Sequence, residues 1–281
     1  MTWRLSGGLQ FLASYTFAKS IDDGSGSGGG SSTNGLLNTV QINDTNSIVG
    51  NQLDNRANRG VSDFDRTHRF VLSFLWELPS PAFARYSKAG RLFFARWQMS
   101  GIFTAMSGLP IDVVDSLAGT FYLGANAGGA RPNFALGETR AMATSNIPSG
   151  YYFNPLAFAR PVVLAGQPIP SSNGTAIANA TGTDFGNVSR NILRGPRQSD
   201  LDFSISKRFR FDESKNIEFR TEIFNLFNQV NFANPISDLN TVPASGIDPN
   251  TGQIRNPGDF GKTISTSNNP RLIQFALKFN F

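Results

Sequence analysis

Hydrophobic and polar residues alternate along several stretches of the chain, most clearly at its C-terminal end. In RLIQFALKFNF, every second residue from Ile273 to Phe281 is apolar, and polar residues take most of the positions between them. Successive side chains of a β-strand point to opposite sides, so this alternation predicts a strand with one apolar face. The last residue belongs to the apolar set, and we expect that set to be covered by something up to the terminus. Its members are Ile273, Phe275, Leu277, Phe279 and Phe281.

Five further stretches repeat the pattern. In DLDFSISKRFRF, Leu201, Phe203, Ile205 and Phe209 oppose a polar set, and NIEFRTEIFNLF behaves in the same way. Leu12, Leu75 and Phe224 depart from the alternation, because each falls among polar positions. The pattern predicts six strands, near residues 2–18, 69–79, 92–108, 200–211, 216–228 and 271–281.

The connections between these strands alternate in length. Long connections span 19–68, 109–199 and 229–270, and shorter ones span 79–91 and 212–216. A soluble β-sandwich also has alternating strands. However, strands of ten residues or more, rich in Phe and Trp, with long and short loops at opposite ends, are typical of transmembrane barrels. We therefore predict an all-β fold, a segment of an antiparallel transmembrane β-barrel with long extracellular loops and a periplasmic C-terminus.

In this arrangement one parity faces lipid and the other faces the lumen. An Arg at the bilayer midplane on the lipid face costs about 2–4 kcal/mol, and Arg208, Arg210 and Arg220 fall on the other parity. Lys207 is the exception, and we expect it to extend to the lipid headgroups. We expect the lumen residues to pair across strands or to contact a plug or a substrate path. They are Asp200, Asp202, Arg208, Arg210, Glu218, Arg220 and Glu222.

Composition and charge exclude several other classes of protein. Charged residues make up 16% of the chain, Phe occurs 25 times and Cys is absent. No stretch reaches the length of a transmembrane helix, and the N-terminal residues lack the pattern of a signal peptide. The net charge is +5, but the basic residues are scattered, so we expect no nucleic-acid partner.

Candidate chemistry is sparse. His68 is the only histidine, and with Asp63, Asp65 and Arg66 we expect it to form a polar cluster where an external loop meets the barrel. Asp22 and Asp23 precede a Gly/Ser run without the spacing of a calcium loop, and GSGSGGG reads as a linker. No nucleophile–base or metal constellation is visible, so we predict no enzyme activity, no catalytic or metal residues and no cofactor.

Several segments resemble one family when they are read in order. They include GLQFLASYTFAKSIDD, NRANRGVSDFDRTHRFVLSFLWELP, RNILRGPRQSDLDFSISKRFRF and DFGKTISTSNNPRLIQFALKFNF. They are similar to the C-terminal part of TonB-dependent outer-membrane receptors of the Oar-like type, which carry a carboxypeptidase-regulatory-like domain. The resemblance implies a 22-stranded plugged barrel, of which this chain is a C-terminal fragment, and a partner, TonB, that acts on a plug outside this chain. The last strand, ending at Phe281, resembles the signature that the barrel assembly machinery recognises.

The resulting hypothesis is an outer-membrane receptor that takes up a solute, with lipid and the assembly machinery as further partners. The alternatives are a structural or porin-like barrel without energy coupling, and a soluble β-rich binding module. GTFYLGANAGGARPNF and YYFNPLAFARP are candidates for ligand contact or for ordinary loop packing. The solute remains open among siderophores, oligosaccharides and peptides, and protein export is a further possibility.

Overall fold

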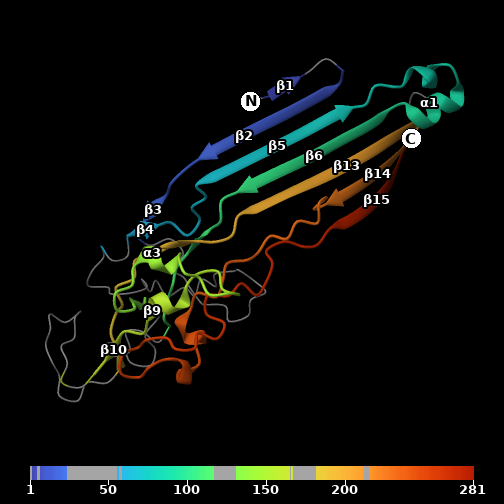
Figure 1. Cartoon of the computed structure of the whole chain (residues 1–281). Helices are drawn as coiled ribbons and strands as arrows, with labels where there is room; N and C mark the ends of the chain where they lie inside the picture. The colour runs from blue at the N-terminus through green and yellow to red at the C-terminus, as the bar shows by residue number, and fades with distance from the viewer. Residues whose placement is uncertain are drawn as a thin grey trace.

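The computed structural model describes residues 2–4, 7–23, 56, 59–116, 131–164, 166, 182–211 and 215–281. Its main feature is one antiparallel seven-stranded sheet with the order β1-β2-β5-β6-β13-β14-β15 (Figure 1). This confirms the predicted all-β class with long antiparallel strands. The sheet is open, because β1 and β15 are its two edges. The strands are β1 (Thr2–Arg4), β2 (Leu9–Phe17), β5 (His68–Glu77), β6 (Trp97–Met106), β13 (Gln198–Arg210), β14 (Asn216–Phe224) and β15 (Leu272–Asn280).

The strand register brings the apolar sets of all strands to one face. A single row of paired residues crosses six strands from β2 to β15, and it contains mostly Phe and Ile. Because a shift of one residue would move a strand's whole apolar set to the other side, this agreement fixes the register. The row is Phe11, Phe74, Gly101, Phe203, Ile223 and Ile273.

Three predicted strand boundaries are wrong. The range 2–18 is a hairpin of β1 and β2, because Gly7 and Gly8 take positive φ angles of 101° and 80° and reverse the chain. The range 216–228 ends at Phe224, because Asn225 and Asn228 adopt φ of 52° and 51° in a turn. Of the predicted turn 212–216, residues 212–214 lie outside the described part.

The predicted strand 92–108 begins only at Trp97. The residues before it form the 3₁₀ helix η1 (Ala82–Arg85) and the helix α1 (Lys88–Phe94). The Ser87 side chain accepts a hydrogen bond from the Gly90 amide at 2.8 Å and so caps α1, whose sequence KAGRLFF contains no β-branched residue. Arg96, with φ of 62°, separates the helix from the strand. Within the described residues, no helix is long and apolar enough to span a bilayer.

Lys207 does not extend to the headgroups as the sequence predicted. Its side chain is 1% exposed, and its Nζ donates a hydrogen bond to the Ala95 carbonyl at the end of α1. The ammonium lies 5.5 Å from the Trp97 ring centroid and 5.4 Å from that of Phe209. A helix C-terminus carries unpaired carbonyls, and here a buried cation satisfies one of them. Lys207 therefore attaches α1 to the sheet.

The hydrophobic core lies outside the sheet, in what we call the loop assembly (residues 107–116, 131–164, 182–197 and 225–271). It occupies the end of the sheet opposite α1 and the C-terminus (Figure 1). Short strand pairs join β7 (Pro110–Ile111) to β12 (Leu193–Arg194), β8 (Asn133–Phe134) to β9 (Phe158–Ala159), and β10 (Val162–Val163) to β11 (Gly182–Thr183). Short helices complete it: α3 (Arg140–Ala143), η3 (Pro155–Ala157), η5 (Leu239–Thr241) and η6 (Ala244–Gly246).

Three buried phenylalanines form the centre of this core. Phe153, Phe158 and Phe260 meet edge to face, with ring centroids between 5.2 and 5.9 Å apart. Such pairs contribute about 0.5–1.5 kcal/mol beyond their buried area. In contrast, Gly101 and Lys207 are the only buried residues of the seven-stranded sheet among those whose burial the structure describes. The sheet itself has no apolar core of its own.

We expect Phe153→Ala to destabilise the loop assembly by about 3–5 kcal/mol, because it removes the ring that contacts both other phenylalanines. Hydrogen exchange of amides in 239–260 would measure the loss as faster opening. Leu136→Ala is the matched control, since Leu136 is 93% exposed in the same assembly and should change little. Equal protection in both variants would contradict a core centred on Phe153.

Candidate functional site

The polar face of the sheet carries all seven residues predicted to face a lumen. All seven have even residue numbers, whereas the apolar residues of β13 and β14 other than Phe224 have odd numbers. The register pairs even residues with even residues, so the seven lie together on one face of the two strands. One line of charges crosses three strands, where Arg208 pairs with Glu218 and Glu218 pairs with Lys278. That this face borders a lumen stays a prediction at this point.

The expected charge pairs form only in part. Arg208 and Glu218 make an ion pair across the β13–β14 hairpin, with 3.1 Å between Nη2 and Oε2. Arg220 instead pairs along its own strand with Glu222, with Nε 3.4 Å from Oε1. The arginines of both pairs are exposed, and exposed pairs contribute about 0–1 kcal/mol, so they add little stability. Arg210 lies opposite Asn216, so its register partner is an amide and not an acid.

The two aspartates of β13 lie near the loop end of this face. Asp202 accepts a hydrogen bond from the Asn225 amide at 3.0 Å and thereby fixes the turn that ends β14. The Asp200 Oδ1 atom is buried and has no hydrogen-bond partner. Asp202 therefore positions the backbone, and it does not pair across the strands as the sequence predicted.

A groove crosses the polar face over β2, β5, β6, β13 and β14. On each strand its lining comprises one residue of the apolar row and the two neighbours of that residue, whose side chains point to the polar side. Its polar lining includes Gln10, Ser73, Ser100, Asp202, Ser204 and Glu222. Its apolar lining includes Leu12, Leu75, Ile102 and Phe224, and three of these are the departures from alternation noted in the sequence. Leu12, Ile102 and Phe224 are exposed, which leaves an apolar strip open on a polar face.

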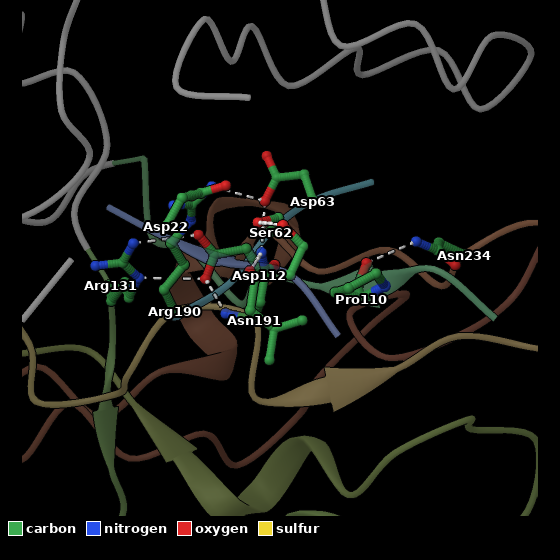
Figure 2. Close-up of polar contacts among 11 residues, drawn as sticks. Asp22, Ser62, Asp63, Pro110, Asp112, Arg131, Arg190, Asn191 and Asn234 are labelled. Carbon is green, nitrogen blue, oxygen red and sulfur yellow. Dashed lines mark hydrogen bonds and ion pairs between the residues drawn. The ribbon is translucent and has the colours of Figure 1, made fainter. Parts of the chain in front are cut away.

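A second polar cluster lies where the first long connection meets the loop assembly (Figure 2). The buried Arg190 forms ion pairs with Asp22 at 2.6 Å and with Asp63 at 3.0 Å. Asp22 belongs to β3 (Ile21–Asp22), which pairs with β4 (Gly60–Val61) just before Asp63. Burial opposes the charge of Arg190, but the two carboxylates outweigh it and raise the pKa of the guanidinium. Arg190 thus joins two connections that are far apart in sequence.

Asn191 and Asp112 extend the cluster. Asn191 has a φ of 52°. Its side-chain Nδ2 donates to the Val61 carbonyl at 2.6 Å, and its backbone N–H donates to Asp112 Oδ1 at 3.2 Å. Arg131 contacts both Asp112 carboxylate oxygens, at 3.2 and 3.4 Å. Burial nevertheless raises the pKa of Asp112 against these donors, and the nearby Asp63 adds to the effect. The cluster is therefore a network of alternating charges.

A further ion pair near the same connection joins Arg194 to the buried Asp65. Burial favours the neutral acid, but the hydrogen bonds from Arg194 and the Ser20 amide and the charge of Arg194 prevail and lower the pKa of Asp65. Asp63 and Asp65 thus join the polar cluster predicted at the loop. His68 does not, because its ring accepts or donates a hydrogen bond with Tyr15 at 2.8 Å and packs beside Phe17.

The loop stretches proposed for ligand contact have different outcomes. Most of 119–134 lies outside the described residues. In 151–161, Phe153 and Phe158 are core residues, and the Tyr151 and Tyr152 hydroxyls donate to carbonyls of Gly258 and Arg194. This stretch therefore serves loop packing. Across the described part of the chain, no group of three or more His, Cys, Asp or Glu side chains is arranged to hold a metal.

Sequence reasoning missed the residues that hold the loops together, namely Arg131, Arg160, Arg190, Asn191 and Arg194. Arg160, for example, contacts both oxygens of the fully buried Asp115, at 2.8 and 3.1 Å. The available signal was an excess of Arg and Asp in the segments NRANRGVSDFDRTH and RNILRGPR. Their pairing could not be read from it, because the partners come from different loops.

Comparison with known proteins adds one finding. The chain matches the family described as an outer membrane beta barrel domain, over residues 1–274. Searches among curated proteins and among solved structures gave no match. The matched range contains the whole loop assembly and every strand of the sheet up to the first residues of β15.

We expect Arg190→Ala to weaken the attachment of β3 and β4 to the loop assembly by about 3 kcal/mol, because two carboxylates lose their buried partner. Hydrogen exchange at 60–63 and 190–194 would report it. The control is Arg255→Ala, because Arg255 is exposed in its pair with Asp248 and the pair should contribute less than about 1 kcal/mol. A change no larger than the control's would show that the network does not hold these loops.

Acid should open the same attachment through Asp65. Because its folded-state pKa is lowered, the carboxylate stabilises the fold above its unfolded pKa, and this stabilisation is lost as the pH falls through the folded value. We expect amides near Asp65 to lose protection, corrected for intrinsic exchange, as the pH falls below about 4, the ordinary pKa of an aspartate. In Asp65→Asn the protection should already be lower at neutral pH and should change less on acidification. An unchanged acid profile in that variant would contradict this role.

Proposed function

The chain belongs to the outer membrane beta barrel domain family, and from this premise we propose that it forms part of the wall of a TonB-dependent receptor of the Oar-like type. The coarse function is that of a barrel protein of the bacterial outer membrane. The finer proposal is uptake of a solute, driven by TonB acting on a plug that fills the lumen. The chain itself carries out no covalent chemistry in this proposal.

The two faces of the sheet support this orientation. Side chains such as Phe275, Leu277 and Phe279 are exposed on the apolar face, as lipid contact requires. The opposite face carries the Arg208–Glu218 pair and the polar groove. We place the end with α1 and the C-terminus in the periplasm and the loop assembly outside, because outer-membrane barrels have their longer connections outside. The exposed apolar set of β15 is then available to the barrel assembly machinery.

The apolar strip in the groove is the observation that carries the plugged barrel. A water-filled porin lumen is polar, so exposed Leu12, Ile102 and Phe224 would face water without compensation. A plug that packs on the strip would bury them, while Asp202 and Glu222 beside it supply polar contacts. The porin-like alternative offers no partner for these side chains.

The loop assembly suits an outer entrance of fixed shape. Its phenylalanine core and its buried ion pairs hold the long connections together, so they are preorganised before any solute arrives. In this proposal it guides a solute towards the plug, and energy input acts on the plug alone.

The test is thiol labelling of Ile102→Cys in the protein expressed from its complete reading frame in outer membranes. These 281 residues contain no cysteine, and any cysteine elsewhere in the reading frame is first replaced by serine, so a charged, water-soluble maleimide reports this position alone. We expect labelling at least tenfold slower than at Leu136→Cys in the loop assembly, because a plug covers Ile102. Labelling should accelerate when TonB and the proton gradient act, and a protonophore should abolish that acceleration.

Each outcome decides between the alternatives. Equal labelling rates at the two positions would favour the open, porin-like barrel. If labelling at position 102 is slow and its rate does not change with TonB or the protonophore, the barrel is plugged but not coupled to energy. That result would overturn the transport proposal.

A further inference from the structure

The connection between β5 and β6 lies at the end of the sheet that carries the C-terminus (Figure 1), and it exposes several aromatic side chains. Helix α1 has no buried residue, although three of its seven residues are large and apolar. The Phe83 and Phe94 rings meet edge to face at 5.2 Å, so η1 and α1 present one continuous surface. Its exposed large apolar members are Phe83, Tyr86, Leu92, Phe93 and Phe94.

Two contacts fix this surface beside the apolar face of the sheet. The indole Nε1 of Trp97 donates to the Phe93 carbonyl at 2.9 Å, and Lys207 donates to the Ala95 carbonyl. Trp97 and Lys207 are register partners and share the parity of the apolar row. Gly90 allows η1 to pack closely on α1, because a Cβ there would lie 3.0 Å from the Ala84 Cα. The exposed aromatics therefore continue the face that meets lipid.

The same connection is strongly basic. Residues 78–98 contain Arg85, Lys88, Arg91 and Arg96 and no Asp or Glu. Lys88, Arg91 and Arg96 are exposed. Aromatic and basic side chains together on a short surface helix are typical of segments that lie in the headgroup region of a membrane, where phosphates are negative and rings are partly buried.

We propose that η1 and α1 form an interfacial anchor that seats its aromatic side chains among the headgroups of anionic phospholipids, with Lys88 and Arg91 on the phosphates. Phospholipid is favoured as the partner because the surface continues the lipid-facing side of the sheet and its charge is opposite to that of the phosphates. The choice of the periplasmic leaflet rests on the orientation proposed above, whereas the binding itself does not. The anchor would fix the depth of β5 and β6 in the bilayer.

The experiment places a single fluorescent label on the protein expressed from its complete reading frame, with any cysteine outside this chain replaced by serine, in vesicles of phosphatidylcholine and phosphatidylglycerol. Ala89→Cys is exposed one turn before Phe93 and leaves every aromatic in place. We expect quenching at position 89 by lipids brominated near the headgroup. Phe275→Cys should be quenched by lipids brominated deep in the acyl region, and Leu136→Cys should not be quenched.

Charge is tested with Lys88→Gln combined with Arg91→Gln. Each basic residue near an anionic surface contributes about a fivefold preference, so the ratio of seated to unseated label should fall about 25-fold. Pure phosphatidylcholine vesicles should have a similar effect on the unmodified segment. Arg140→Gln combined with Arg255→Gln, both in the loop assembly, is the matched control and should change nothing.

An unquenched label at 89 beside a quenched one at 275 would overturn the anchor, and the surface would then await a protein partner. If quenching at position 89 is the same without phosphatidylglycerol and in the double glutamine variant, the proposed recognition of phosphate is wrong. Absence of quenching at 89 and 275 together would overturn the bilayer orientation of this face and the anchor with it. None of these readings depends on solute uptake, so failure here is distinct from failure of the transport proposal.

Discussion

Strand register is the constraint on which the rest of the structure depends. The row from Phe11 through Gly101 to Ile273 aligns six strands so that each contributes its apolar set to one side. Because side chains alternate with a period of two, the same register also gathers the polar residues and the groove on the other side. It also sets Lys207 beside Trp97, which attaches α1 to the sheet. One pairing scheme thus places the apolar face, the polar face and the helix.

The two halves of the molecule depend on different sources of stability. The loop assembly buries Phe153, Phe158 and Phe260 and compensates its buried charges with carboxylates, as a water-soluble domain does. The sheet buries almost nothing of its own, so its apolar face needs lipid and its edges need neighbouring strands. The polar groove lies between these regimes, with Ile102 exposed beside Asp202. In the proposed orientation the protein therefore borders three separate environments, namely water, lipid and lumen.

The sequence predicted what depends on local pattern. Alternation assigned the faces of β13, β14 and β15 correctly, because period-two patterning is a property of each strand alone. It failed at Leu92, Phe93 and Phe94, because an apolar run of this kind is compatible with a capped helix as well as with a strand. It also failed at Gly7, where the chain reverses direction. It also could not pair Arg190 with Asp22 or Asp112 with Arg131, because such contacts follow from how distant loops meet. The sequence alone assigned no role to the departures at Leu12, Leu75 and Phe224. The register of the sheet shows that all three line one groove.

The ion pair between Arg190 and Asp22 joins residues that are 168 positions apart. Closing so large a loop carries an entropic cost and slows folding, because distant segments have to meet before the contact contributes anything. The loop core shows the same dependence, since Phe260 completes a cluster begun at Phe153. In the orientation proposed above, every long connection has to cross the bilayer before the assembly can close. A closed loop assembly would then mark a chain whose strands are all inserted.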